Sequence, residues 1–145
     1  MTVRSRLERF ARLPLGAQLE FVEAALMLPI AWIAVRSVAL PTLGAFSIPA
    51  RARGGAEDAR RIGRAVRVAG EFVPSTCLSR SIAMRWMLSR RGVASELRLG
   101  VRLENGSLAA HAWVEHGGVA LEEPGDVAEQ YADLGRAAGT ESRAK

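Results

Sequence analysis

The spacing of apolar residues changes once along the chain, and this change constrains the fold more than any other feature. Before Gly92 the apolar side chains recur every three or four residues, which is typical of helices. From Val93 they alternate, with Leu97, Leu99 and Val101 apolar and the intervening residues charged or glycine. Helices followed by antiparallel strands predict an α+β domain whose N-terminal half is helical.

Helical spacing is found in four segments: residues 3–13, 17–38, 57–72 and 75–91. The second half of the second segment is apolar nearly all round, so we expect a mostly buried core helix. Pro29 lies inside it and should kink it or split it in two. Beyond this helix, Pro41, Gly44 and Pro49 predict an irregular connection.

Turn residues divide the second half of the chain into strands. Asn105-Gly106 is a strong hairpin signal, so the strand that ends near Leu103 should return over residues 108–115. A second turn at residues 116–118 should lead into a third strand over residues 119–123. These strands predict a small antiparallel meander. Residues 126–134 then have the pattern of a short amphipathic helix.

The length, charge and composition of the chain exclude several classes of protein. The 145 residues and the net charge of +5 fit one globular domain, and the positive charge comes from arginines spread over many segments. With aromatic residues at 6%, nucleic-acid binding is not expected. Residues 24–35 are uncharged but too few to span a bilayer, so peripheral membrane contact stays open. One cysteine forms no internal disulfide, and no signal-peptide cleavage site follows, which favours the cytoplasm.

The single cysteine, Cys77, stands where the fourth helix should begin. Pro74 precedes this start, and Ser75 or Thr76 can cap the free backbone N–H groups of the first turn. The positive end of a helix dipole favours a thiolate, which is the nucleophilic form of cysteine. The alternative interpretation is a small, inert apolar residue.

A histidine and a carboxylate follow in the predicted strands, and a cysteine, a histidine and an acid can together form a nucleophilic site. A three-residue turn over residues 116–118 would place His111 opposite Glu123. A two-residue turn at Gly117-Gly118 would pair Trp113 with Glu122 and make Glu122 the neighbour of His111. No zinc-site spacing and no phosphate-binding loop is found, so no metal or other cofactor is expected.

Several segments resemble the lasso peptide biosynthesis B proteins, which are leader peptidases of the transglutaminase-like, or papain-like, cysteine protease superfamily. The resemblance lies in CLSRSIA (77–83), RRGV (90–93), LRLGV (97–101) and AHAWVE (110–115). It implies that Cys77 is the nucleophile and His111 the base. It also favours Glu123 as the acid, at a position where the family usually has aspartate.

The same resemblance implies an activity and partners. The protein would remove the leader from a ribosomally made precursor peptide, and a cyclase similar to asparagine synthetases would then close the macrolactam ring. Residues 1–72 do not fit the winged-helix-like recognition module of some family members, so a separate leader-recognition protein is expected. A basic surface over residues 4–12 or 51–64 could dock it, although either patch is more simply a solvated face.

The division of the chain follows from this interpretation. We expect a single domain over residues 1–145, with a helical subdomain (1–72), a catalytic core (73–135) and a disordered tail (136–145). Two other classes stay open. One is an acyl transferase or amidase on the same fold, and the other is a non-catalytic peptide-binding module in which Cys77 and His111 merely pack.

Overall fold

A computed structural model describes residues 3–39 and 54–136, and it confirms the α+β class. Within these two ranges the strands form one antiparallel sheet of four in the order β3-β2-β1-β4. The irregular connection expected around Pro41, Gly44 and Pro49 lies outside the described residues. In chain order the elements are α1 (Val3–Ala11), α2 (Leu15–Ser37), α4 (Ala56–Ala69), α5 (Cys77–Arg90), β1 (Glu96–Glu104), β2 (Ser107–His116), β3 (Val119–Ala120), α6 (Val127–Gln130) and β4 (Ala132–Arg136).

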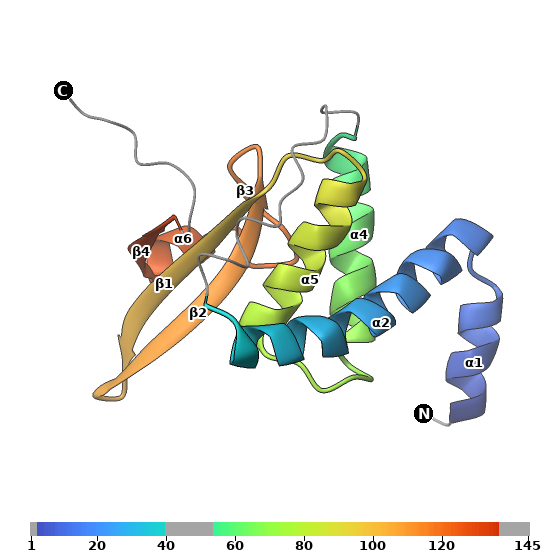
Figure 1. Cartoon of the computed structure of the whole chain (residues 1–145), viewed down its shortest axis with the longest axis horizontal. Coiled ribbons are helices and arrows are strands. Elements are labelled where there is room, and N and C mark those ends of the chain that lie inside the picture. The colour runs from blue at the N-terminus through green and yellow to red at the C-terminus, as the bar shows by residue number, and fades with distance from the viewer. Residues whose placement is uncertain (1–2, 40–53, 137–145) are drawn as a thin grey trace.

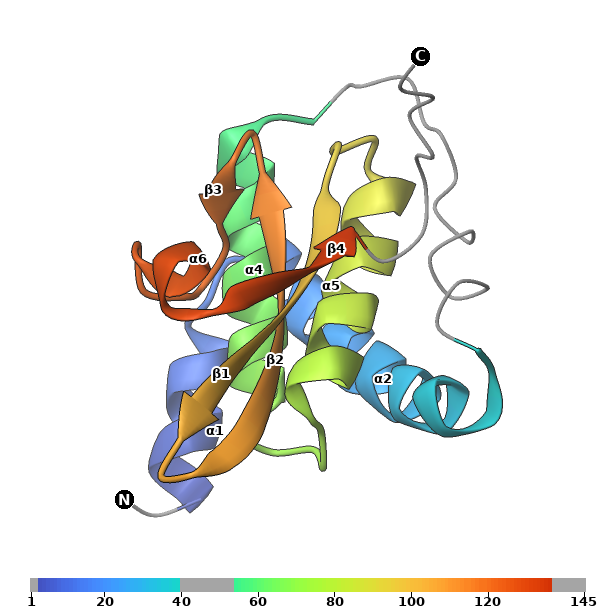
Figure 2. The same cartoon turned by 90° about the vertical axis from the view of Figure 1, so that its left-hand side faces the viewer.

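The helix α5 lies at the centre of the molecule. It packs on β2 and β1 on one side and on α4 and α2 on the other, so the helices cover one face of the sheet (Figures 1 and 2). Burial of these apolar faces is the main source of stability. Among the described residues, the largest fully buried apolar side chains come from four elements, α2, α4, α5 and β2: Leu28, Ile62, Val66, Ile82, Met87, Leu88 and Val114.

Local signals in the sequence set the ends of α5 and of the first hairpin. Gly92 has a φ of 68° and ends α5, with the Val93 N–H donating to the Leu88 carbonyl at 3.0 Å. Asn105 and Gly106 have φ values of 49° and 78°, the conformation of a two-residue hairpin turn between β1 and β2. Both features agree with the sequence analysis.

The second hairpin departs from the favoured expectation. Gly117 and Gly118 have φ values of 58° and 78°, and His116 pairs with Val119, so the turn has two residues and not three. Two successive left-handed residues match the twist of the flanking strands. The expected extension of β3 to residue 123 is also wrong, because Glu122 has a φ of 56° and leads the chain out of the sheet.

The expected helix over residues 126–134 is only partly present. After the single turn of α6 the chain forms β4, which pairs with β1 on the side away from β2. The Cβ of Tyr131 occupies the space beside Gly100, where a larger residue would keep β4 away. Arg136 belongs to β4, and the tail expected from there lies at residues 137–145, outside the described residues.

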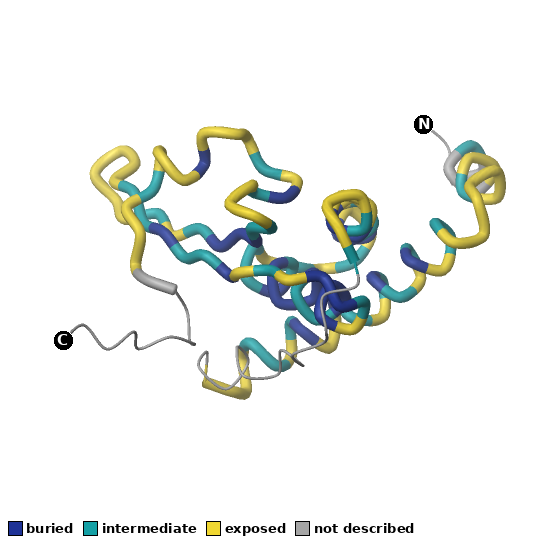
Figure 3. Tube along the Cα trace, turned by 90° about the horizontal axis from the view of Figure 1, so that it is seen from above, coloured by how far each residue is buried: buried dark blue, intermediate teal, exposed yellow. Residues whose placement is uncertain are grey.

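The prediction that α2 is a mostly buried core helix is wrong. The helix is unbroken through Pro29, so Pro29 does not split it in two. Only one narrow face is buried, whereas the rest of the helix is exposed or half-buried (Figure 3). Its length and composition would suffice to cross a membrane, and 22% of an apolar stretch of 18 residues within it is buried in the structure. The buried residues of this inner face are Glu20, Ala24, Leu28 and Ala31.

Two carboxylates attach the inner face of α2 to the other helices. Glu20 accepts hydrogen bonds from Arg61 of α4, and this interaction raises the pKa of Arg61. Glu23 forms ion pairs with Arg90 and Arg91 at the end of α5. The expectation of a buried helix failed for a simple reason. The apolar side chains of α2 itself lie nearly all round its axis, whereas the rest of the domain covers only one side of the helix.

The space beside Gly100 provides a test of the β1–β4 contact. A Cβ at Gly100 would lie 2.5 Å from the Tyr131 Cβ and 3.1 Å from two ring carbons of Trp113. We expect Gly100→Ala to lower the free energy of unfolding by about 1–3 kcal/mol, measured by urea denaturation. Gly125→Ala is the matched control, because a Cβ there meets nothing within 4 Å. Equal stability of the two variants would contradict this packing.

Candidate active site

The cysteine is the first residue of α5, and a reciprocal pair of hydrogen bonds fixes this helix start. Thr76 Oγ1 accepts from the Ser79 N–H at 3.2 Å, and the Thr76 N–H donates to Ser79 Oγ at 2.8 Å. These bonds form a capping box and satisfy backbone donors that the helix itself leaves free. The expected cap is therefore present at Thr76, and it places Cys77 in the first turn.

A guanidinium group holds the loop that leads into α5. Arg80 donates from Nε to Ser75 Oγ at 2.8 Å and from Nη2 to the Gly70 carbonyl at 3.0 Å. Gly70 leaves room for this side chain, since a Cβ there would lie 2.7 Å from Arg80 Nε. The end of α4 and the start of α5 are thereby held together.

A buried serine fixes α5 against the strand that carries the histidine. Ser81 lies one helical turn after Cys77 and is 4% exposed. Its hydroxyl donates to the carbonyl of Ala112 at 3.0 Å. Because Ala112 follows His111 directly, this hydrogen bond fixes the position of the first turn of α5, and so of Cys77, along the axis of β2.

The imidazole of His111 is held by a carboxylate and two aromatic rings. His111 Nε2 lies 3.0 Å from Glu123 Oε1, and the two side chains are 24% and 25% exposed. The imidazole ring stacks on the Trp113 ring, with the two ring centroids 6.0 Å apart. The centroid of the Tyr131 ring lies 5.3 Å from that of the imidazole. The pairing of His111 with Glu123 therefore occurs without the three-residue turn from which we expected it.

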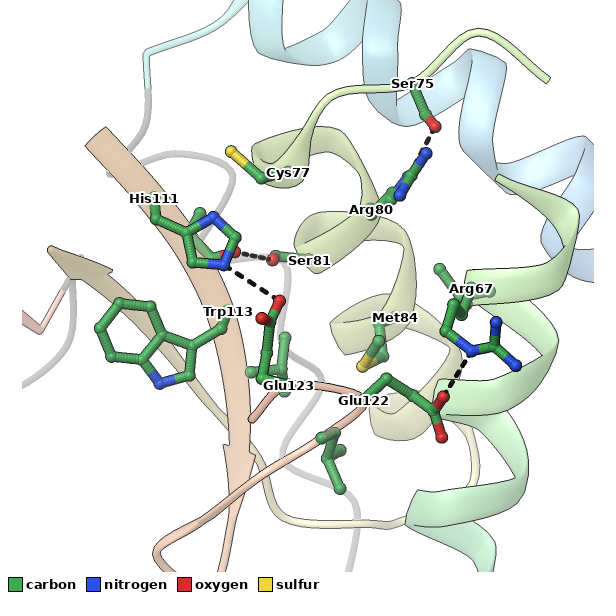
Figure 4. Close-up of a pocket in the computed structure, with 14 residues that line it drawn as sticks. Arg67, Ser75, Cys77, Arg80, Ser81, Met84, His111, Trp113, Glu122 and Glu123 are labelled. Atoms are coloured by element: carbon green, nitrogen blue, oxygen red, sulfur yellow. Dashed lines mark hydrogen bonds and ion pairs between the residues drawn. The ribbon is translucent and has the colours of Figure 1, made fainter. Parts of the chain in front are cut away.

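The neighbouring carboxylate points elsewhere. Glu122 accepts a hydrogen bond from Arg67 Nε of α4 at 2.7 Å. Its left-handed backbone conformation turns the chain between the two glutamates, so their side chains leave in different directions (Figure 4). Of the two acids weighed from the sequence, only Glu123 is hydrogen-bonded to His111.

The three predicted site residues line one cavity of about 230 Å³. Figure 4 shows the imidazole of His111 between Cys77 and Glu123, with the second ring nitrogen on the Cys77 side. Within the described part of the chain, the thiol of Cys77 forms no hydrogen bond, to His111 or to any other residue. The residues that line the cavity also include the apolar residues Val66, Met84 and Leu121.

This arrangement contains the groups that acyl chemistry needs. With a proton on Nε2 donated to Glu123, the imidazole keeps Nδ1 as an acceptor for a thiol proton. The first intrahelical bond of α5 runs from the Arg80 N–H to the Thr76 carbonyl at 3.0 Å, so the N–H of Cys77 precedes the helical ladder. Among residues 3–39 and 54–136, no group of three or more His, Cys, Asp or Glu is placed to hold a metal ion.

Three residues that hold the site in place, Arg80, Ser81 and Tyr131, were not identified from the sequence. Ser81 and Arg80 share α5 with Cys77, and the helical spacing from Cys77 to Ser81 was a signal that could have identified Ser81. Tyr131 had no such signal, because its position depends on β4 returning to pair with β1.

Comparison with known proteins gives one match. The family model described as the transglutaminase-like superfamily matches residues 24–136, from within α2 to the end of β4. Cys77, His111 and Glu123 all fall within the matched range. No curated protein and no solved structure matches the chain.

The contact between α5 and β2 can be tested at Ser81. Replacing Ser81 by Ala leaves the Ala112 carbonyl without its donor, and we expect the free energy of unfolding to fall by about 1–3 kcal/mol. Ser107→Ala, at an exposed serine of the hairpin, is the matched control and should change stability little. Urea denaturation of both variants measures the difference. A Ser81 variant as stable as the control would show that this hydrogen bond does not hold α5 in place.

Proposed function

The chain belongs to the transglutaminase-like superfamily, and on this basis we propose that it is a cysteine peptidase that removes the leader from a lasso precursor peptide. The superfamily includes cysteine peptidases and acyl transferases. The observation that carries the proposal is the hydrogen bond of His111 to Glu123 in the cavity that Cys77 lines from a helix start. Glu123 is the third member of the proposed triad.

In the proposed mechanism His111 prepares the nucleophile. The Glu123 carboxylate accepts the Nε2 proton of the imidazole and fixes the tautomer in which Nδ1 is free. Nδ1 then takes the proton of the Cys77 thiol, and the first turn of α5 favours the resulting thiolate. Nucleophile and base are commonly farther apart without substrate than during the reaction, so the missing hydrogen bond between the Cys77 thiol and His111 does not argue against this proton transfer.

The remaining steps follow from this proton transfer. The thiolate attacks the carbonyl carbon at the junction of leader and core, and the Cys77 N–H donates a hydrogen bond to the oxyanion that forms. His111 returns its proton to the leaving amine, which frees the N-terminus of the core peptide. Water then attacks the thioester, with His111 again as base, and releases the leader with a free carboxylate.

The choice of substrate is supported by the sequence segments around these residues. The segments CLSRSIA (77–83) and AHAWVE (110–115) resemble those of lasso leader peptidases, and they contain Cys77 and His111. In this proposal a separate recognition protein delivers the leader. A cyclase similar to asparagine synthetases uses the freed amine to close the ring. The precursor is made by ribosomes, so we place the reaction in the cytoplasm, where the thiol stays reduced.

Substitution of the nucleophile tests the activity. We expect Cys77→Ala to abolish cleavage of a lasso precursor peptide, in the presence of a leader-recognition protein, while thermal unfolding stays unchanged. Mass spectrometry should find free leader with the unmodified enzyme only. An amide crosslink or released ammonia would instead indicate an acyl transferase or amidase. Cleavage at the normal rate by the Cys77 variant would refute the assignment.

The two neighbouring glutamates allow a test that needs no substrate. We expect iodoacetamide to alkylate Cys77 at neutral pH about tenfold or more slowly in His111→Ala, because the imidazole no longer takes the thiol proton. Glu123→Ala should also slow the reaction. Glu122→Ala is the matched control and should react like the unmodified protein, since Glu122 binds Arg67. Equal rates in all four proteins would support a non-catalytic binding module.

A further inference from the structure

The outer face of α2 is an apolar surface that the proposed function leaves unused. It consists of aliphatic side chains at intervals of three or four residues, all 46% to 71% exposed. We call this set the outer arc. Its members are Leu15, Leu19, Val22, Leu26, Ile30 and Ile33.

The outer arc carries no polar side chain. The carboxylates of α2 are Glu20 and Glu23, and both form ion pairs with arginines of α4 or α5 on the inner side. Pro29 lies on the exposed side as well and lacks a backbone N–H. A helix that is apolar on both faces is buried by something on both faces. Within the described residues the inner face has its cover, whereas the outer arc faces solvent.

Arginines lie at both ends of the outer arc. Arg9 and Arg12 are exposed before the start of α2, where the Gln18 side chain donates to the Leu13 carbonyl and fixes the turn from α1. Arg36 is exposed in the last turn, with its guanidinium 3.7 Å from the centroid of the Trp32 ring. The arc is therefore aliphatic in its middle and cationic at its ends.

This distribution argues against a second copy of the chain as the occupant. Antiparallel pairing of two outer arcs would place Arg36 near Arg12 of the other copy, and parallel pairing would place each arginine beside its equivalent. Like charges in contact disfavour both arrangements. The arc also lacks the tyrosine, tryptophan and methionine that are enriched at the centre of protein interfaces.

A lipid surface matches the same distribution. Helices that lie in the plane of a bilayer bury aliphatic side chains among the acyl chains, and flanking arginines bind anionic headgroups. We propose that the outer arc of α2 is a peripheral membrane-binding face for bilayers that contain anionic lipids. The helix does not cross the bilayer, because Glu20 and Glu23 attach its inner face to α4 and α5.

Vesicle co-sedimentation of the full chain tests the proposal. We expect it to sediment with vesicles of phosphatidylcholine and phosphatidylglycerol, and much less with phosphatidylcholine alone. Leu19→Gln/Leu26→Gln should lower the partition coefficient by about tenfold or more, because two aliphatic anchors are lost. Leu103→Gln/Leu108→Gln is the matched control at the tip of the β1–β2 hairpin, where the leucines are 75% and 72% exposed. This control should bind like the unmodified protein.

A second variant covers the case in which the first does not fold. Arg12→Gln/Arg36→Gln changes only exposed side chains, and it should weaken binding to the anionic vesicles alone. Failure of the unmodified protein to sediment with anionic vesicles would overturn the proposal, as would equal losses in the arc and hairpin variants. A dimer in light scattering that only the arc variant disrupts, without vesicle binding, would assign the face to a second copy. A monomer without vesicle binding would point to a partner protein.

Discussion

The packing of the first turn of α5 against β2 is the constraint on which the candidate site depends. Cys77 lies on the helix and His111 on the strand, so only the contact between these two elements determines how the thiol and the imidazole are placed. Buried apolar side chains such as Ile82 and Val114 supply most of the energy, at about 1.5–3 kcal/mol each. Apolar burial does not specify one position of the helix along the strand. The hydrogen bond from Ser81 to the Ala112 carbonyl specifies that position.

The sequence predicted the features that depend on a few neighbouring residues. The helix start at Thr76, the helix end at Gly92 and the turn at Asn105-Gly106 each need one or two side chains with a known backbone preference, and all are present. Features that depend on distant segments were missed. The strand β4 forms because β1 has an open edge and Gly100 leaves space for Tyr131, and neither condition can be recognised within residues 126–134.

The case of α2 shows a different limit. Apolar side chains nearly all round the helix indicate that it is covered on every side, but they do not indicate what covers it. We took the rest of the domain as the cover, and α4 and α5 reach only the inner face, where Glu20 and Glu23 meet their arginines. The ion pairs hold α2 in one orientation, and this orientation directs the aliphatic side chains outward. The exposed face is thus a consequence of how the inner face is attached.

Glu123 lies beside His111 as expected, although the strand register from which we expected this contact is wrong. The two-residue turn at Gly117-Gly118, extended as a regular strand, would have selected Glu122. The ladder instead ends at Leu121, whose N–H donates to the Val114 carbonyl at 2.9 Å and whose side chain is buried. Glu122 then adopts a left-handed conformation, which costs a residue with a Cβ about 1–2 kcal/mol. Its ion pair with Arg67 helps to offset that cost. Because glutamate has no preference for this conformation, no local signal in the sequence marks the turn after which Glu123 meets the imidazole.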